Sequence, residues 1–401
     1  MSGGDDVVPT GGGPRMDRVA VPGAVVERFH EPDGAAEVAR VIARTAREGG
    51  SLLVAGGRTR LHWANPARPL SEGLSLRGLR GIDEFEPEEG VLHARAGTPV
   101  AEVREVTERE GWELGFDPPG ASSTIGGVIA TAVTGPRAQC FGRVADSLLG
   151  LELVGADGVV SKCGGRVVKN VTGYDMAKLY CGSFGTLGVV TGAWLRLRPA
   201  PAIRCAFEAS PAEHGVDLEA CRRLAELGSV RAFLWLEGGG GGVPSIELEL
   251  AGSEAEVAHD RAEIEAGLPL VEIPFERIDA RRDARAEPGD DGVVLRARVL
   301  ARRVGELAWT LRATGLRLEI EPGLGVVHAR GALETPADLQ DIRTRAESLG
   351  GLATFEVLPE AWRARLDVFG APGGSVRLMA EIKRRFDPAG VLNPGRFVAG
   401  I

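Results

Sequence analysis

The sequence predicts an α+β protein in which a cofactor-binding half is followed by an α+β cap. Three observations lead to this prediction. At 401 residues the chain is too long for one typical hydrophobic core, so two domains are expected. Glycine-rich segments gather in the first half of the chain. The second half mixes predicted strands with predicted helices and lacks comparable cofactor-binding segments, which is typical of an α+β domain.

Three segments of the first half carry glycine among small, polar and β-branched residues. They are 54–61 (VAGGRTRL), 117–137 (DPPGASSTIGGVIATAVTGPR) and 164–191 (GGRVVKNVTGYDMAKLYCGSFGTLGVVT). Because glycine has no Cβ, a backbone that contains it can approach a ligand closely or adopt a positive φ. The three segments therefore predict a large cofactor that main-chain N–H groups hold along its length.

Charge and composition exclude several classes of protein. The formal net charge is −9, and nucleic-acid binding needs a basic surface, so no nucleic-acid partner is expected. No apolar run approaches the roughly 20 residues that a transmembrane segment needs. Residues 1–20 are predicted to form a disordered tail, and they show no signal-peptide pattern. A cytoplasmic protein is therefore expected.

The cysteines and histidines predict no metal site. The six histidines form no HxH or HExxH group, and the five cysteines include no CxxC pair. The cysteines are widely spaced, at positions 140, 163, 181, 205 and 221. Any redox chemistry is therefore expected to come from an organic cofactor.

Helices and strands alternate along the first half. A helix is predicted over 33–49, because an apolar stripe with helical spacing runs from Ala35 to Ile42. Thr98 is expected to cap a second helix that has Pro99 at its first position. Strands are predicted at 51–55, 91–96 and 194–198, a hairpin at 148–154 and 159–162, and a linker at 199–201.

The second half predicts a different arrangement. Alternating strands at 231–237 and 245–250 are joined by five consecutive glycines, 238–242. Ser253 and Glu256 fit a capping box for a helix that ends near Ala266. Further strands are predicted at 293–300, 317–321 and 326–330, and further helices at 304–314 and 336–349.

Three motifs carry a resemblance to a known family. They are STIGG (Ser123–Gly127) followed by Gly135-Pro136-Arg137, KNVTGYDMAKLYCGSFGTLGVVT (Lys169–Thr191), and FDPAGVLNPGRF (Phe386–Phe397). With these motifs the chain resembles the FAD-binding subunit of bacterial glycolate oxidase, within the vanillyl-alcohol-oxidase-type (PCMH-fold) flavoproteins. The resemblance covers about residues 20–200 and the last 20 residues.

The resemblance implies a fold and its boundaries. A PCMH-type FAD-binding domain of two α/β subdomains is expected over 21–201, and an α+β cap over 205–385. The C-terminal segment 386–401 is expected to return to the FAD-binding domain. Its apolar residues Val391 and Leu392 need a core to bury them, and Asn393-Pro394-Gly395 favours a turn.

The resemblance also implies which residues bind FAD. The first loop would wrap the pyrophosphate, the second would pass the ribityl chain and the flavin ring, and the third would lie near the ribose and adenine. The expected cofactor-binding residues are Ala55, Gly56, Gly57, Arg58, Thr59, Arg60, Pro119, Gly120, Ser123, Thr124, Ile125, Gly126, Gly127, Gly135, Gly182, Ser183, Gly185, Gly188, Val189 and Val190. No metal-binding residue is expected.

The FAD is expected to be bound noncovalently. Some relatives attach FAD through a histidine after the first glycine pair, where this chain has Arg58. His62 is interpreted as an ordinary loop or surface histidine. Lys169-Asn170 and Tyr174-Asp175 are interpreted as residues that brace their loop by hydrogen bonds, with a catalytic role as the alternative.

The catalytic residues are left unknown at this stage. His328 is a weak candidate for a general base that reaches over the flavin from the cap, and a structural role is the alternative. Positive charge near phosphate or reduced flavin could come from Arg58, Arg137, Arg143 or Arg396.

The resemblance implies a role in a complex. The expected function is that of an FAD-dependent oxidoreductase, the flavin subunit of a glycolate (2-hydroxyacid) oxidase or dehydrogenase. Its partners would be a second flavin subunit, an iron–sulfur subunit and the small hydroxyacid substrate, and membrane association would come only through partners. Two alternatives stay open: a stand-alone flavin-dependent hydroxyacid oxidoreductase, and a non-catalytic assembly subunit that FAD stabilises.

Overall fold

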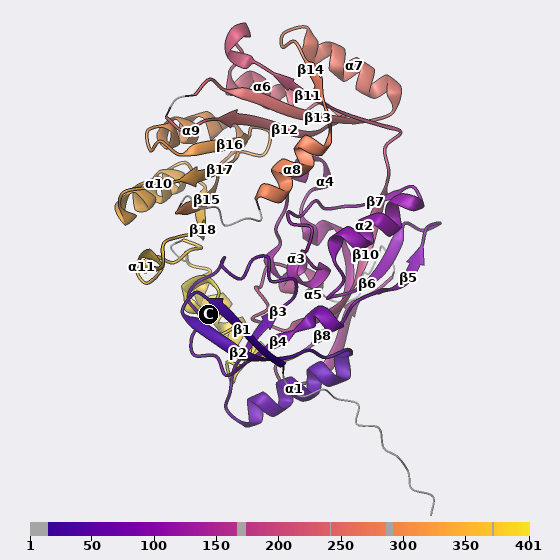
Figure 1. Ribbon diagram of the computed structural model, residues 1–401, viewed down its shortest axis with the longest axis vertical. Helices are drawn as coiled ribbons and strands as arrows, with labels where there is room; N and C mark the ends of the chain where they lie inside the picture. The colour runs from indigo at the N-terminus through magenta and orange to yellow at the C-terminus, as the bar shows by residue number, and fades with distance from the viewer. Residues whose placement is uncertain (1–14, 167–173, 241, 286–291, 371–372) are drawn as a thin grey trace, which may run out of the picture.

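The computed structural model describes residues 15–166, 174–240, 242–285, 292–370 and 373–401. In Figure 1 the first half of the chain forms the lower part of the molecule and the cap forms the upper part. The lower part contains two β-sheets and the upper part contains one. The predicted α+β organisation, two α/β subdomains followed by an α+β cap, is confirmed.

The first subdomain is a four-stranded sheet with the order β1-β2-β4-β3. β1 pairs with β2 antiparallel, whereas β2 and β3 both run parallel to β4. The predicted first helix is present, and its buried Val38 and Ile42 join the core of the second sheet. The elements are β1 (Arg15–Val21), β2 (Ala24–His30), α1 (Ala35–Arg47), β3 (Leu52–Ala55) and β4 (Glu72–Ser75).

The prediction of a disordered tail is wrong for residues 15–20, because they form most of β1. Gly23, with a φ of +81°, lies in the turn between β1 and β2. The side chains of β1 are largely exposed until Val21, so the strand depends on its backbone ladder with β2. A strand without a buried face carries no strong sequence pattern. Residues 1–14 lie outside the described part of the chain.

The second subdomain is a six-stranded sheet with the order β5-β6-β10-β8-β9, in which β7 also pairs with β10. Its strands are β5 (Ile82–Glu86), β6 (Val91–Arg95), β7 (Trp112–Leu114), β8 (Leu148–Val154), β9 (Val160–Gly164) and β10 (Val189–Pro199). Its helices are α2 (Val100–Arg109), α3 (Ile125–Thr131), α4 (Ala138–Phe141) and α5 (Met176–Tyr180). The predicted hairpin of β8 and β9 is confirmed.

Two local predictions in this subdomain need correction. The closing strand begins at Val189 rather than Trp194, because its first five residues are all buried and show no alternation. Thr98 does not cap α2. Its hydroxyl instead donates to the carbonyl of Gly81 and accepts from the amide of Gly81, both at 2.9 Å, and Pro99 takes the N-cap position.

The cap is built on an eight-stranded sheet with the order β14-β11-β13-β12-β16-β17-β15-β18. Its strands are β11 (Ile203–Ala209), β12 (Val230–Glu237), β13 (Ser245–Gly252), β14 (Val271–Ile273), β15 (Val293–Arg298), β16 (Arg317–Glu321), β17 (Val326–Gly331) and β18 (Leu352–Val357). Its helices are α6 (Leu218–Leu224), α7 (Glu254–Glu265), α8 (Glu276–Ala284), α9 (Val304–Arg312), α10 (Pro336–Ser348) and α11 (Glu360–Arg363). The strands and helices predicted from the second half are present with nearly the predicted bounds.

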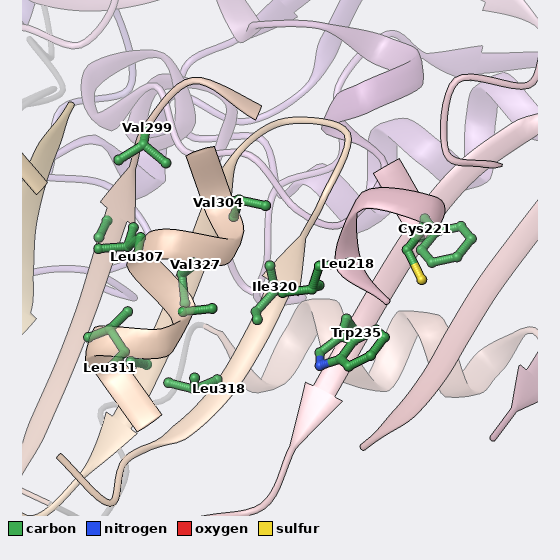
Figure 2. Packing of buried hydrophobic residues seen from close by; sticks show 14 of the residues in the cluster. Leu218, Cys221, Trp235, Val299, Val304, Leu307, Leu311, Leu318, Ile320 and Val327 are labelled. Atoms are coloured by element: carbon green, nitrogen blue, oxygen red, sulfur yellow. The ribbon is translucent and has the colours of Figure 1, made fainter. Parts of the chain in front are cut away.

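One face of the cap sheet packs on helices. Figure 2 shows Val304, Leu307 and Leu311 of α9 near Ile320 of β16 and Val327 of β17. These five side chains are at most 2% exposed. The helical spacing of the first three and the alternation along β16 produced the correct sequence predictions for these elements.

The opposite face of the cap sheet carries buried charge. Glu247 and Glu249 of β13 are both 0% exposed and alternate with apolar residues that join the helix-covered core. Glu247 pairs with Arg277 and Arg281 of α8, at 2.8 and 2.9 Å. A buried carboxylate needs such partners, because an unpaired charge away from water is costly.

Glu249 belongs to an ionic cluster that joins the cap to the first half. Arg137 donates to Glu249 at 2.6 Å and to Asp117 at 3.0 Å, and all three residues are buried. Arg104 from α2 and Arg282 from α8 also pair with Asp117, at 2.9 and 3.2 Å. The cluster therefore connects the second subdomain to two elements of the cap.

The C-terminal segment lies against the first subdomain. In Figure 1 the yellow end of the chain lies beside the indigo strands β1 and β2. The amide of Leu52 donates to the carbonyl of Val391 at 2.7 Å, and the amide of Asn393 donates to the carbonyl of Leu52 at 3.0 Å. Helix α12 (Val376–Phe386) precedes the segment. The last residues thus continue the first sheet at the edge of β3.

Asp387 fixes the turn between α12 and this segment. Its carboxylate accepts from the amides of Val391 and Leu392 at 2.9 and 2.8 Å and pairs with Lys383 at 2.6 Å. We expect Asp387→Ala to lower the free energy of unfolding by about 3 kcal/mol, because a buried charge pair loses one member. Urea denaturation would measure the loss.

Glu381→Ala is the matched control for Asp387→Ala, because Glu381 lies on the same helix and pairs only with exposed arginines in the described part of the chain. We expect no measurable change for Glu381→Ala. Equal unfolding midpoints for the two variants would contradict the role given to Asp387.

The ionic cluster predicts a pH dependence of stability. Burial alone would raise the pKa of Asp117, but Arg137, Arg104 and Arg282 outweigh it and hold that pKa below 3.8. Since the folded pKa is depressed, the stabilisation is complete above pH 3.8 and is lost as the pH falls below it. We expect Asp117→Asn to cost about 3 kcal/mol at pH 7 and to flatten the acid limb of the stability profile. A variant with the same acid limb as the unmodified chain would argue against this assignment.

Candidate functional site

A cavity lies where the three glycine-rich segments meet. It contains about 880 Å³ of space and opens partly to solvent. Its wall combines the loop after β3, the region of α3, the segment from α5 to β10, and two residues near the C-terminus. The lining residues are Val54–Leu61, Leu76, Ser123, Thr124, Gly126–Val128, Ala130, Thr131, Val133, Tyr180, Ser183–Gly185, Gly188–Val190, Asn393 and Arg396.

Thr124 joins the first and second loops. Its hydroxyl oxygen accepts from the amide of Gly127 at 3.3 Å and from the amide of Gly57 at 3.4 Å. Nearby, the hydroxyls of Thr59 and Ser123 form a hydrogen bond of 3.1 Å. Both loops are therefore fixed against each other before any ligand binds.

Asn393 joins the first and third loops. Its side-chain oxygen accepts from the amide of Val54 and its side-chain nitrogen donates to the carbonyl of Phe184, both at 2.8 Å. The second and third loops are linked through backbone bonds from Gly182 to Ile129 and from Phe184 to Ala130, both 2.8 Å long. Every pair of loops is thus tied by hydrogen bonds that do not depend on a ligand.

The first glycine pair allows two loops to approach each other. A Cβ at Gly56 would lie 2.2 Å from the Thr124 hydroxyl, and one at Gly57 would lie 2.0 Å from the carbonyl oxygen of Ser122. Real side chains do not reach such distances. These glycines are therefore required by protein packing, in addition to any close approach of a cofactor.

Most of the cofactor-binding residues predicted from the sequence lie on this cavity. These are Ala55, Gly56, Gly57, Arg58, Thr59, Arg60, Ser123, Thr124, Gly126, Gly127, Ser183, Gly185, Gly188, Val189 and Val190. They come from three loops that are far apart in the sequence, and the fold brings them to one wall.

Five of the predicted residues lie elsewhere. Ile125 is fully buried in the core of the second subdomain. Gly120 donates its amide to Asp283 of the cap at 3.0 Å, and Pro119 accepts from the Ser123 hydroxyl at 2.8 Å. A Cβ at Gly135 would lie 2.2 Å from the carbonyl oxygen of Asp117. Gly182 adopts a φ of +82° behind the cavity wall.

The four arginines considered for positive charge separate into two groups. Arg58 and Arg396 line the cavity, and Arg58 pairs with Asp17 at 2.5 Å. Arg137 is buried in the ionic cluster at the cap, and Arg143 is exposed and pairs with Asp146 at 2.8 Å. Only the first two are placed to act on a ligand in this cavity.

Several lining residues were missed by the sequence interpretation. Tyr180, Phe184 and Asn393 all lie in recognised motifs, but nothing in their spacing showed that they face the cavity. Phe184 packs edge-on against Trp63 with ring centroids 5.4 Å apart and adopts a φ of +55°. The asparagine of the C-terminal motif was assigned to a turn, whereas its side chain links two loops.

His62 lies in the loop after the first glycine pair and does not line the cavity. It is half-buried rather than fully at the surface. Burial, and then the charge of Arg60, lower the pKa of His62 to about 4. Of the residues expected to brace the third loop, Lys169 and Asn170 lie outside the described part of the chain, while Asp175 pairs with Lys178 at 3.1 Å.

His328 lies in a separate cavity within the cap. Its Nε2 is 3.4 Å from Glu321, which also pairs with the buried Arg285. The cavity contains about 1110 Å³ of space, and Glu356 and Arg330 line it as well. The histidine is therefore part of a charged network in the cap and does not line the glycine-rich cavity.

Within the described ranges, no group of three or more histidine, cysteine, aspartate or glutamate side chains could hold a metal ion. No helix among the same residues is long and apolar enough to cross a membrane.

Sequence comparison relates the chain to flavoproteins. A family described as an FAD binding domain matches residues 26–164. Glycolate oxidase subunit GlcE of Escherichia coli is 30% identical over 366 residues, which are 87% of this chain and 93% of that protein. D-lactate dehydrogenase of Archaeoglobus fulgidus is 34% identical over 172 residues, 42% of this chain and 38% of the relative. Glycolate oxidase subunit GlcD of Bacillus subtilis is 31% identical over 188 residues, 45% and 38% of the two chains.

Comparison with solved structures supports the fold. p-Cresol methylhydroxylase with substrate bound superposes with a TM-score of 0.71 at 15% identity, over 94% of this chain and 89% of that one. Alkyldihydroxyacetonephosphate synthase superposes with a TM-score of 0.68 at 15% identity, over 92% and 76% of the two chains. At this level of identity the match establishes the architecture alone.

The packing of Gly57 generates a prediction. We expect Gly57→Ala to lower the free energy of unfolding by at least about 2 kcal/mol and to reduce FAD retention, because its Cβ would push against the Ser122 backbone. Thermal melting and the flavin absorbance per chain would measure both effects. Gly305→Ala is the control, since its Cβ meets nothing within 4 Å in α9 and should not destabilise the chain. If Gly57→Ala behaved like Gly305→Ala, the two loops would not be in close contact.

Proposed function

The chain belongs to the family of FAD-binding oxidoreductases that includes glycolate oxidase subunit GlcE, and from this we propose that it is the flavin subunit of a multi-subunit 2-hydroxyacid oxidase. The chain itself is an FAD-binding oxidoreductase with the PCMH-type fold. The names of two relatives describe subunits of glycolate oxidase, which supports the presence of partner subunits.

The observation that carries the proposal is the single cavity formed by the three glycine-rich loops. Its residues fit FAD in the shape of the wall. The wall is largely backbone and small side chains, which lets an extended cofactor lie close to the chain.

We assign roles to the loops on this basis. The loop of Gly56 and Thr59 would bind the pyrophosphate through main-chain amides other than that of Gly57, which donates to Thr124. Thr124 would donate its hydroxyl proton to the cofactor, since its oxygen already accepts from two amides. Gly185 and Val190 would line the ribose and adenine. When bound, FAD supplies a flavin ring that accepts two electrons from a substrate.

The geometry favours noncovalent attachment of FAD. The position after the first glycine pair is Arg58, whose guanidinium pairs with Asp17 and stacks 4.4 Å from the Phe29 ring centroid. His62 lies outside the cavity lining. Neither residue offers a nucleophile that faces the cavity.

The partners would complete the electron path. We propose a second flavin subunit and an iron–sulfur subunit, because the five cysteines of this chain are widely spaced in the sequence and reduced flavin must pass its electrons to an acceptor. The stand-alone alternative has one observation in its favour, the charged cap cavity that contains His328. The alternative of an assembly subunit predicts bound FAD that does not turn over even in the complex.

Expression of the chain alone tests the proposal. We expect purified protein to carry one FAD per chain, to release it into the supernatant on acid precipitation, and to oxidise glycolate or D-lactate only slowly with a dye acceptor. Addition of the partner subunits should raise turnover, because the proposed oxidase is the assembled complex rather than this chain alone.

Three results would contradict different parts of the proposal. Flavin that stays with the acid precipitate would show covalent attachment. Fast turnover by the chain alone would favour the stand-alone alternative. A complex whose activity survives replacement of FAD in this chain by 5-deaza-FAD, which exchanges a hydride but cannot pass on single electrons, would favour the assembly alternative.

A further inference from the structure

Arg60 is a buried cation on the cavity wall with unused donors. It is 8% exposed, and its Nε and Nη2 are buried and donate to no atom of the described residues. The residue follows Thr59 directly, so its backbone is fixed by the first loop. A buried guanidinium with unmet donors is costly, and the cost is relieved when an oxyanion binds.

Arg396 presents a second unused donor on the same wall. It is 4% exposed, and its Nη2 donates to the carbonyl of Leu61 at 2.8 Å. This bond ties Arg396 to the backbone of the first loop, one residue after Arg60, although 335 positions separate donor and acceptor in the chain. The Nη1 of Arg396 is buried and has no partner among the described residues.

The neighbouring arginines have carboxylate partners of their own. Arg285 pairs with Glu319 and Glu321, and Arg296 lies 3.9 Å from Glu356. Burial lowers the pKa of Arg60, Glu356 offsets this in part, and Arg296 and Arg285 add to the lowering. Burial, together with Arg363, lowers the pKa of Arg396 to about 10. Among the described residues no carboxylate forms an ion pair with Arg60, so a bound anion would stabilise it.

Unlike Arg60, Arg58 on the same wall has a carboxylate partner. Its guanidinium pairs with Asp17, so the chain neutralises that cation with its own carboxylate. Arg60 has no comparable contact: Glu356 acts on it through its charge, and no hydrogen bond joins them in the described structure.

Arg60 lies on the side of the cavity that faces the cap. Its guanidinium is 5.8 Å from the ring centroid of Trp63, and the guanidinium of Arg296, from β15 of the cap, is 5.6 Å from the same ring. Glu356, which acts on Arg60, lies on β18 and lines the cap cavity. An anion held by Arg60 would therefore lie between the cofactor cavity and the cap.

We propose that Arg60, through its two unused donors, holds the carboxylate of a small acid on the wall that Arg396 also lines, so that this chain itself binds the 2-hydroxyacid substrate. The proposal rests on the proposed function for the identity of the acid. The planar donor fork of arginine matches the two oxygens of a carboxylate. The pyrophosphate of FAD has the same oxyanion chemistry and is the rival occupant that the experiment must separate.

The test compares carboxylate binding with FAD retention in Arg60→Gln. Acetate, which has no hydroxyl to oxidise, is titrated into flavin-loaded protein while the flavin absorbance is followed, and ethylene glycol is the neutral control probe. We expect the Kd for acetate to rise about tenfold or more in the variant, with FAD content unchanged. Arg40→Gln, which removes one exposed charge from α1, should leave both quantities unchanged.

A second readout needs no flavin. Acetate should raise the Tm of the unmodified chain relative to the same concentration of chloride, and Arg60→Lys should reduce that gain while keeping the charge. This variant and Arg396→Lys preserve the test if Arg60→Gln fails to fold.

The outcomes separate the two proposals. Loss of FAD from Arg60→Gln, with an unchanged acetate Kd in the molecules that stay loaded, would show that the arginine holds the pyrophosphate and would overturn the subsite. Flavin-loaded protein that does not respond to acetate by either readout would also overturn it. Purified chain without flavin would instead contradict the proposed function, and the Tm measurement would then decide the subsite by itself.

Discussion

The close contact between the first two glycine-rich loops is the constraint on which the cavity depends. Gly56 and Gly57 lie so near Thr124 and Ser122 that no Cβ fits between them. The contact directs the amides of Gly57 and Gly127 to one hydroxyl oxygen, that of Thr124. Since this oxygen accepts a hydrogen bond from each loop, the wall is formed without a ligand, and a ligand that binds there does not have to order it at an entropic cost.

The C-terminal segment also holds the loops together without a ligand, from the far end of the chain. Asn393 bonds to the first and third loops at once, and the neighbouring backbone continues the first sheet at β3. Arg396, from the same segment, reaches the carbonyl of Leu61. A chain that passes through the cap and returns therefore closes the cavity with its last residues, which couples folding of the FAD-binding part to completion of the cap.

Buried charges and a group of aromatic rings (Phe184, Phe369 and Phe397) hold the cap against the rest of the chain. The apolar clusters of the cap and of the second subdomain are separate, and between them lie Asp117, Arg137 and Glu249. Buried ion pairs require a defined geometry, so the cap cannot shift relative to the first half without breaking them. The cap is thus fixed in register over the cavity, so that its Arg296 and Glu356 act on the region around Arg60.

The sequence alone determined the fold class, the elements with a regular apolar period, and the three glycine-rich loops that line the cavity, because period and glycine content are local properties. It missed β1, which has no buried face, and the first half of β10, which is buried on both faces. The sequence also could not distinguish a glycine that lines the cavity, such as Gly57, from one that only allows close packing. Gly135 is of the second kind, because a Cβ there would clash with the backbone of Asp117. Only the tertiary structure decided which arginines line the cavity with donors that no described residue accepts from, as Arg60 does. It likewise decided which arginines pair with carboxylates at the contact with the cap, as Arg137 does. That distinction depends on partners such as Asp17, Asp117 and Glu249, which are brought together by folding and have no fixed spacing in the chain.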